Sequence, residues 1–433
     1  MKLTCCFVIP VALIFACIIE AQVADAPDGM NTGIPVNYTE AKVGTYALPD
    51  PLKLANGHLI TDAQTWFEKR RPEIVRLFEE NQYGRAPGRP ADMSFDVFDR
   101  GTIAFDGKAT RRQITIYFSK DTLGPKVDLL LYLPANSRQP VPVLLNVGFT
   151  ANNLMVSDPG VKTGLNFDPM KKQRVPAVPG KFNFGGIDVL PVIERGFGLA
   201  TLNYSDIDPD MPGGLPFGVR YLYLKPGQAE PAPDEWGSIA AWAWGLSRVL
   251  DYLETDPGVD AKRVALMGVS RLGKTVLWTA ARDTRFALVI ASCSGEGGAA
   301  LSRRNYGETI KHLVAPTRYP YQFCANYAKY ADHVDQFPVD SHMLLALIAP
   351  RPVLLQTGDT DRWSDPRGEY LAAVAASPVF KLLGKEGIDA PQMPAAGAPI
   401  LHTLGYFMHS GGHGMLPSDW PHIFRFMEMH LSR

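Results

Sequence analysis

Residues 264–275 read VALMGVSRLGKT, and this stretch decides how the chain folds. An apolar run comes first, then a turn with a serine at position 270, then a segment with helical spacing. This order is typical of a strand, a tight turn and a helix within a sheet that carries helices on its faces. Reactive groups in such sheets lie at the carboxyl ends of the strands, so the turn is a candidate functional site.

The turn, residues 268–275, matches two motifs with different chemistry. Letter for letter it is G-x-x-x-x-G-K-[ST], the phosphate-binding P-loop, in which Lys274 would reach the terminal phosphates. It also places Ser270 on a strand-to-helix turn between small residues, like the nucleophile elbow of α/β-hydrolases. A glycine-rich turn without chemistry is a third interpretation, but it does not explain why Ser, Arg and Lys are concentrated there.

The surrounding sequence argues against the P-loop. At least five expected strands precede the motif, whereas a P-loop usually opens its domain. No apolar strand ending in Asp follows directly to hold magnesium. The N-terminus predicts export to a compartment where nucleoside triphosphates are scarce. We therefore favour a serine nucleophile.

Length and charge limit the class of protein. The chain has 433 residues and a net charge of −1, which is enough to bury one large core or two smaller ones. Near-neutral charge without a basic run argues against a nucleic-acid partner.

The first 26 residues are expected to be a signal peptide. Lys2 supplies a short charged region, and residues 7–19 form an apolar run that is too short to span a bilayer. A lipoprotein signal with Cys17 as the acylated residue and an uncleaved anchor are the alternatives. We expect an exported protein, in the periplasm, on the cell surface or in the medium.

Cysteine usage excludes a disulfide scaffold. Cys5, Cys6 and Cys17 lie in the leader, so Cys293 and Cys324 can form at most one disulfide. Their spacing also makes a poor zinc site.

The chain changes character along its length. A helix is expected over 63–81, followed by strands over 93–98, 103–105, 112–118, 127–133 and 141–147. Strands over 198–204, 264–267, 286–292 and 352–356 then alternate with helices over 234–253, 274–281 and 421–431, with Asp234 capping the first and Ser418 or Asp419 the last.

This order predicts an α/β-hydrolase fold, a three-layer α/β/α sandwich with a mixed, mostly parallel central sheet. We expect one catalytic domain over 27–433, with an N-terminal arm. Irregular insertions near 148–190 and 297–350 are expected to form a binding surface, because unstructured insertions of that length are uncommon otherwise.

A serine nucleophile needs a base, because a hydroxyl is weakly nucleophilic until its proton is removed. His413 lies in the loop GGHG at 411–414, just before the final helix, where this fold places its histidine. A metal pair of His409 and His413 is the alternative, but the intervening glycines interrupt the helix that such ligation favours.

The base in turn needs a carboxylate to orient it. Glu296 follows the strand after the nucleophile, and Asp361 follows the next strand. Spacing alone does not choose between them, although the later loop is the commoner position of the acid in α/β-hydrolases. Either carboxylate could instead cap a turn.

With these residues assembled, the chain resembles the glucuronoyl esterases of carbohydrate esterase family 15, in particular their bacterial branch. The resemblance covers most of the chain after about residue 60. It is carried by residues 268–274, 293–298, 344–352 and 361–363 and by the His413 loop. It implies cleavage of the ester between (4-O-methyl)-glucuronic acid on xylan and lignin alcohols, without a metal or a cofactor.

The resemblance also implies catalytic roles. Ser270 would be the nucleophile, His413 the base, and Arg271 part of the oxyanion hole. Fungal members carry the acid where Cys293 stands here, and a cysteine cannot act as a carboxylate does. That departure favours Asp361 as the acid, with Glu296 in reserve.

Three further residues match sugar-contacting positions of the family, namely Lys274, Glu308 and Trp363. Acetate offers no negative or hydroxylated acyl group for Lys274, Arg271 and Glu308 to recognise, which argues against another exported carbohydrate esterase such as an acetyl-xylan esterase. A catalytically inactive, glycan-binding relative is the competitor from a different class, and the intact triad argues against it. We expect a monomer that acts on a glucuronoxylan or lignin–carbohydrate ester.

Overall fold

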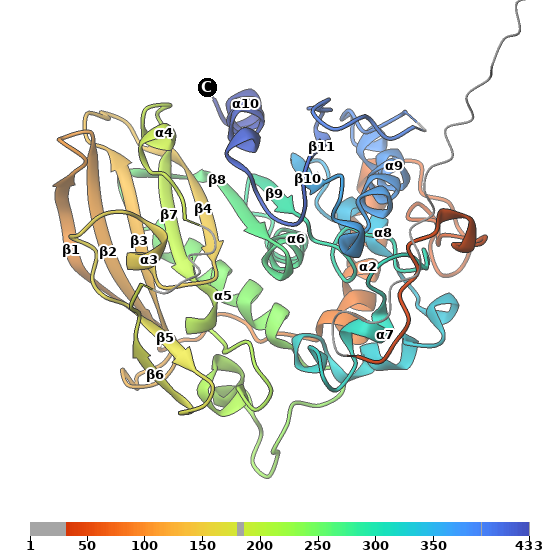
Figure 1. Ribbon diagram of the computed structural model, residues 1–433, viewed down its shortest axis with the longest axis horizontal. Coiled ribbons are helices and arrows are strands. Elements are labelled where there is room, and N and C mark those ends of the chain that lie inside the picture. The colour runs from red at the N-terminus through yellow and green to blue at the C-terminus, as the bar shows by residue number, and fades with distance from the viewer. Residues whose placement is uncertain (1–31, 180–185, 391, 433) are drawn as a thin grey trace, which may run out of the picture.

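A sheet of nine strands forms the centre of the computed structural model, which describes residues 32–179, 186–390 and 392–432 (Figure 1). The strand order is β1-β2-β3-β7-β4-β8-β9-β10-β11. Strands β1, β2, β3 and β7 pair antiparallel, and β7, β4, β8, β9, β10 and β11 pair parallel. The expected signal peptide, with Cys17, lies outside the described residues.

The strands of this sheet are β1 (Ser94–Ala104), β2 (Ala109–Tyr117), β3 (Lys126–Pro134), β4 (Val141–Gly148), β7 (Gly198–Asn203), β8 (Val259–Val269), β9 (Leu288–Ser292), β10 (Val353–Gly358) and β11 (Leu404–His409). The helices are α1 (Ala63–Thr65), α2 (Arg71–Phe78), α3 (Asn152–Met155), α4 (Leu190–Ile193), α5 (Ser238–Leu253), α6 (Arg271–Arg282), α7 (Ile310–Leu313), α8 (Ser341–Ala346), α9 (Pro366–Leu382) and α10 (Trp420–Leu431).

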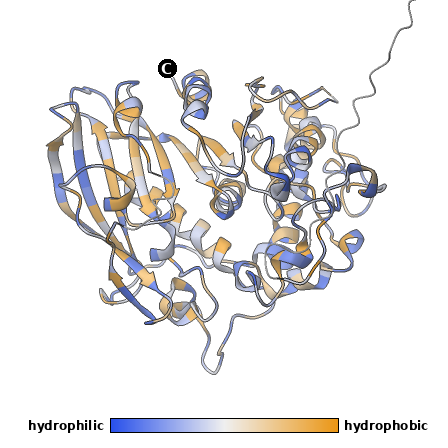
Figure 2. Cartoon of the chain, viewed as in Figure 1, coloured by the Kyte–Doolittle hydropathy of each residue, from blue (hydrophilic) through white to orange (hydrophobic). Residues whose placement is uncertain are grey.

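Side chains along each strand point alternately to the two faces of the sheet, so each face has its own hydrophobic core. Neighbouring residues of β8 divide between them: Leu266 packs in the larger core with α2, α5, α6, α8 and α9, and Met267 packs in the smaller core with α3, α4 and α10. The central strands are coloured hydrophobic in Figure 2, whereas β1 at the sheet edge alternates with hydrophilic residues. Helices therefore cover both faces, and the predicted three-layer α/β/α fold is confirmed.

Most expected elements are present with shifted ends. The helix expected over 63–81 runs continuously from Ala63 to Tyr83, including two short π-helical turns. Strand β4 is buried along its whole length, as its apolar run predicted.

Three expectations about elements were wrong. Residues 93–98 and 103–105 belong to one strand, β1, with irregular register near Asp99. The cap of α5 is Gly237, because the carboxylate of Asp234 pairs with Arg85 instead. The last strand expected from the sequence ends at residue 356, but the sheet has a further strand, β11, after it.

The two insertions contain short regular elements. Residues 148–190 contain helix α3 and a hairpin of β5 (Leu165–Asp168) and β6 (Gln173–Pro176). Residues 297–350 contain the short helices α7 and α8. Figure 1 shows the hairpin and α7 on opposite sides of α5 and α6.

The parallel strands bring distant segments together. The residues that follow β8, β9, β10 and β11 all lie at one edge of the sheet, because parallel strands end at the same edge. Within the described residues, no helix is long and apolar enough to cross a membrane.

Candidate active site

Ser270 occupies a strained turn between β8 and α6. Its φ and ψ of 60° and −127° lie in a region that non-glycine residues seldom adopt. Its N–H donates to the carbonyl of Ser292 at 2.8 Å, which ties the turn to the end of β9. Such an over-determined strained serine is what the nucleophile elbow requires.

Two glycines allow this turn to be tight. A Cβ on Gly268 would lie 2.4 Å from the carbonyl oxygen of Leu272, and one on Gly273 would lie 2.9 Å from that of Ser292. Larger residues at either position would push helix α6 away from the strands. Contact with the neighbouring backbone therefore explains why small residues occur on both sides of Ser270 in the sequence.

His413 and Asp361 are hydrogen-bonded. Nδ1 of His413 lies 2.7 Å from Oδ2 of Asp361 and 3.2 Å from the hydroxyl of Ser364. Asp361 is buried, whereas the His413 side chain is 37 % exposed. Burial alone raises the pKa of Asp361, but the hydrogen bonds and charge of His413 and the hydroxyl of Ser364 outweigh it and lower that pKa below its usual value.

Glu296 lies in a different environment. Its Oε1 accepts hydrogen bonds from the hydroxyls of Ser302 at 2.7 Å and Tyr327 at 2.8 Å. Complete burial raises its pKa to about 8. Of the two acid candidates, Asp361 is therefore the one that the structure brings to His413.

Cys293 lies beside this pair. Its Sγ accepts a hydrogen bond from the backbone N–H of Gly414 at 3.3 Å, and burial raises the pKa of its thiol. Potential ligand atoms of Cys293, Asp361 and His413 lie within 4.8 Å of one another. A tetrahedral zinc site separates its ligand atoms by roughly 3.4 Å, so an ion would have to break the 2.7 Å bond between His413 and Asp361. Both Cys293 and Cys324 are free thiols.

Arg271 is held beside the nucleophile. Its guanidinium pairs with Asp210, donates to the hydroxyl of Tyr319 at 2.9 Å and lies 4.3 Å from the centre of that ring. Burial by itself lowers the pKa of Arg271, but the charge of Asp210 raises it well above its ordinary value. The side chain is thus a fixed cation.

Asp210 also binds side chains other than Arg271. It also accepts hydrogen bonds from the hydroxyls of Tyr204 at 2.8 Å and Tyr321 at 3.1 Å and from the amide of Gln322 at 2.7 Å. Asp210 and Tyr319 lie 61 and 48 residues from Arg271, in irregular segments. No spacing in the sequence links them, so sequence reasoning missed both.

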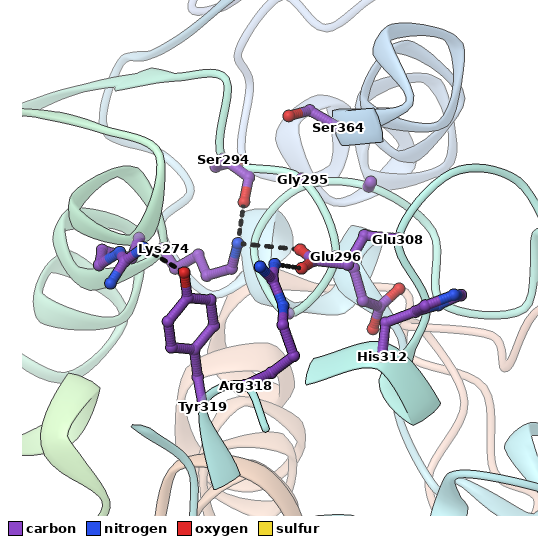
Figure 3. A network of polar contacts seen from close by, with 12 residues as sticks. Lys274, Ser294, Gly295, Glu296, Glu308, His312, Arg318, Tyr319 and Ser364 are labelled. Atoms are coloured by element: carbon purple, nitrogen blue, oxygen red, sulfur yellow. Dashed lines mark hydrogen bonds and ion pairs between the residues drawn. The ribbon is translucent and has the colours of Figure 1, made fainter. Parts of the chain in front are cut away.

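Lys274 lies one helical turn beyond the serine and points into a polar network (Figure 3). Its Nζ donates to the carbonyl of Ser294 at 2.7 Å and lies 3.8 Å from a carboxylate oxygen of Glu308. The other oxygen of Glu308 accepts from Arg318 at 2.9 Å. Burial lowers the pKa of Lys274, and the charge of Glu308 opposes that effect.

Trp363 completes this group. The Arg318 guanidinium lies 5.5 Å from its ring centre, and the His312 ring meets it edge-on at 5.3 Å. The structure thus brings Lys274, Glu308 and Trp363 together around Arg318, a residue that the sequence did not single out.

Comparisons with known proteins agree on one family. A family model described as the glucuronyl esterase of fungi matches residues 231–384. Carbohydrate esterase MZ0003, from an unknown prokaryotic organism, is 41 % identical over 405 residues, which cover 92 % of each chain.

Solved structures are similar over the same length. A glucuronoyl esterase from Solibacter usitatus is 44 % identical, with a TM-score of 0.85, covering 90 % of this chain and 100 % of that one. A CE15 glucuronoyl esterase from Teredinibacter turnerae is 31 % identical, with a TM-score of 0.76, covering 92 % and 93 %.

Proposed function

Because this chain belongs to carbohydrate esterase family 15, the glucuronoyl esterases, we propose that it hydrolyses the ester between (4-O-methyl)-glucuronic acid of glucuronoxylan and lignin alcohols. It is a carboxylic ester hydrolase. The observation that carries the proposal is the strained Ser270 on an elbow at the same sheet edge as the hydrogen-bonded pair of His413 and Asp361.

The proposed reaction is a two-step acyl transfer. His413 removes the proton of Ser270, whose Oγ attacks the carbonyl carbon of the uronic ester. The tetrahedral intermediate collapses, the bond to the alcohol oxygen breaks, and His413 returns the proton to that oxygen. Water, deprotonated by His413, then hydrolyses the glucuronoyl–Ser270 ester and regenerates the serine.

Asp361 supports this cycle through its hydrogen bond. Its carboxylate fixes His413 in the tautomer that carries a proton on Nδ1, which leaves Nε2 free to accept the serine proton. It also stabilises the imidazolium that forms in each step. The low pKa of Asp361 keeps the carboxylate charged at the working pH.

Arg271 is proposed to stabilise the oxyanion. A cation held by Asp210 and Tyr319 needs no reorganisation when negative charge develops on the carbonyl oxygen. Backbone N–H groups at the start of α6 add to the same effect.

The polar network around Lys274 supports a hydroxylated acyl group. An ammonium, a carboxylate and an aromatic ring at Lys274, Glu308 and Trp363 match the hydroxyls and apolar face of a pyranose. An acetyl-xylan esterase needs none of these groups, and an inactive glycan-binding relative does not need the strained serine.

Export is part of the proposal. The N-terminal sequence supports a signal peptide over residues 1–26 and leaves acylation at Cys17 as an alternative. The enzyme would then meet its plant-polymer substrate outside the cytoplasm.

The substrate is tested by kinetics on the purified enzyme with benzyl D-glucuronate, methyl galacturonate and p-nitrophenyl acetate. We expect kcat/KM to be highest for the glucuronate by at least about tenfold. If only p-nitrophenyl acetate is hydrolysed, the protein is an esterase but the proposed glucuronate substrate is wrong. If none of the three esters is hydrolysed, an inactive, glycan-binding relative is favoured.

A further inference from the structure

A short stretch of the second insertion, residues 304–308, lies between the N-terminal arm and the loop that carries the catalytic acid. On one side of this stretch, the N–H of Gly307 donates to the carbonyl of Asn37 in the arm at 2.9 Å. On the other side, the N–H of Glu308 donates to the carbonyl of Trp363 at 2.8 Å. The arm, which is red in Figure 1, is thus connected to the loop of the acid.

This acid loop, residues 361–365, carries three groups of the site. Asp361 orients His413, the hydroxyl of Ser364 lies 3.2 Å from the same imidazole nitrogen, and Trp363 belongs to the polar network of the sugar. A misplacement of about 1 Å in such groups can cost about 10²-fold in rate. The position of the acid loop therefore matters for the reaction.

The acid loop ends at Asp365, whose backbone lies in the left-handed region with φ 51° and ψ 72°. Residues other than glycine keep this conformation where the surrounding structure holds them in it. The Asp365 carboxylate is buried, and its Oδ2 accepts a hydrogen bond from Nε of Arg304 at 2.8 Å. Among the residues that the structure describes, no other cationic side chain lies within ion-pair distance of Asp365.

Arg304 joins the acid loop to the arm. Its Nη2 pairs with the carboxylate of Glu40 in the arm, and its guanidinium lies 5.1 Å from the ring centre of Tyr306. Only 4 % of the Arg304 side chain is exposed. Burial by itself lowers the pKa of Arg304, but Asp365 and Glu40 outweigh that effect and raise this pKa above its ordinary value. The guanidinium is therefore a fixed cation between two carboxylates.

We infer that Arg304 is a positioning residue for Asp361 and that Glu40 shares this role. The inference rests on the proposed function, because it needs Asp361 to orient His413. A planar guanidinium can bond two carboxylates at once through separate nitrogens, and an amide has no charge with which to do so. Without this bridge, Asp365 would be a buried charge without a cation. The acid loop would then shift, and the bond between Asp361 and His413 would weaken.

The test is a double-mutant cycle on the full chain, measured as kcat for benzyl D-glucuronate. Arg304→Gln should lower kcat at least about tenfold, and Arg304→Lys should lose less, because the ammonium can still pair with Asp365. In the Asp361→Asn background, Arg304→Gln should change kcat less than about threefold, because the carboxylate that it positions is already gone. A general loss of folded protein would instead lower kcat by the same factor in both backgrounds.

Two further variants separate positioning from folding. Arg303→Gln is the matched control, because Arg303 is a neighbouring arginine, 9 % exposed, that pairs with Asp340. It should leave kcat within about twofold in both backgrounds. Glu40→Gln changes a side chain that is 44 % exposed, so it should fold even where Arg304→Gln does not. It should lower kcat about threefold, and only when Asp361 is present.

Each outcome decides the inference. If Arg304→Gln and Glu40→Gln lower kcat by the same factors with and without Asp361, the bridge is merely structural and the inference is wrong. If the wild type hydrolyses p-nitrophenyl acetate but not the glucuronate, the proposed substrate is wrong. The cycle on the acetate ester then still decides the inference, because that reaction needs the same triad. Inactivity of the wild type on both esters would overturn the proposed function and the inference together.

Discussion

Nδ1 of His413 lies 2.7 Å from Oδ2 of Asp361, and the two residues belong to loops that follow adjacent parallel strands. The last residues of β10 and β11, Gly358 and His409, are paired in register. The fold therefore sets the imidazole and the carboxylate side by side although 52 residues separate them.

The first prediction concerns the acid. Asp361→Asn should lower kcat roughly 10³- to 10⁴-fold, because the amide favours the wrong tautomer of His413. Glu296→Gln should change kcat less than about threefold, since Glu296 bonds to Ser302 and Tyr327. Steady-state kinetics on benzyl D-glucuronate measures both, and a larger loss in Glu296→Gln would show that Glu296 is the acid.

The second prediction uses the position of Cys293. Its Sγ lies within 4.8 Å of potential ligand atoms of both His413 and Asp361. The double variant Asp361→Asn/Cys293→Glu should have a kcat at least about tenfold higher than that of Asp361→Asn alone, because a carboxylate again reaches the imidazole. Cys293→Gln in the same background is the neutral control. Equal rates for the two double variants would contradict the geometry.

The third prediction concerns Arg271. Arg271→Lys should lower kcat by about 10²-fold with little change in KM, because an ammonium cannot keep both the Asp210 pair and the Tyr319 bond while facing the oxyanion. Tyr319→Phe keeps the ring under the guanidinium and removes one hydrogen bond, so we expect a loss below about tenfold. A rise in KM alone in Arg271→Lys would assign the residue to substrate binding.

The fourth prediction concerns stability. Glu369 is fully buried and accepts hydrogen bonds from the N–H of Gly295 and the hydroxyl of Ser294, and its Oε2 has no hydrogen-bond partner among the residues that the structure describes. Burial raises its pKa to about 8. Between pH 4.5 and 8 the unfolded chain releases this proton and the folded chain keeps it, so the free energy of unfolding falls as pH rises, by up to about 1.4 kcal/mol per pH unit for one such group.

Glu369→Gln should remove the contribution of this residue to the pH dependence of the free energy of unfolding. The variant should match the wild type near pH 5 and exceed it in stability at pH 8, as measured by urea unfolding across this range. Glu428→Gln changes an exposed glutamate on α10 and serves as the control. Parallel stability curves for wild type and Glu369→Gln would mean that Glu369 is charged in the folded state.

The sequence predicted the parts of the site that depend on local pattern. An apolar run, a glycine-flanked serine and a helical segment predicted the elbow at Ser270, because the turn needs small residues for steric reasons. Strand β11 escaped prediction because its short apolar run, with Gly405 inside and a glycine loop after it, resembles a connecting segment. Gly405 is required there, since a Cβ would lie 2.8 Å from the carbonyl oxygen of Ile400.

The supports of the site could not be predicted in this way. Asp210, Arg318 and Tyr319 lie in irregular segments whose paths depend on tertiary contacts rather than on periodicity. The ion pairs of Asp210 with Arg271 and of Arg318 with Glu308 can be recognised only in the folded structure.

Turnover of benzyl D-glucuronate by Ser270→Ala, compared with the wild type, tests the central claim most directly. The two proteins should have the same unfolding transition, because the change removes a single hydroxyl from a partly exposed turn. We predict that kcat falls by at least roughly 10⁴-fold, since the nucleophile and His413 act as a unit. Turnover by Ser270→Ala near the wild-type rate would contradict the account, because the glucuronoyl–serine intermediate could then play no part in the reaction.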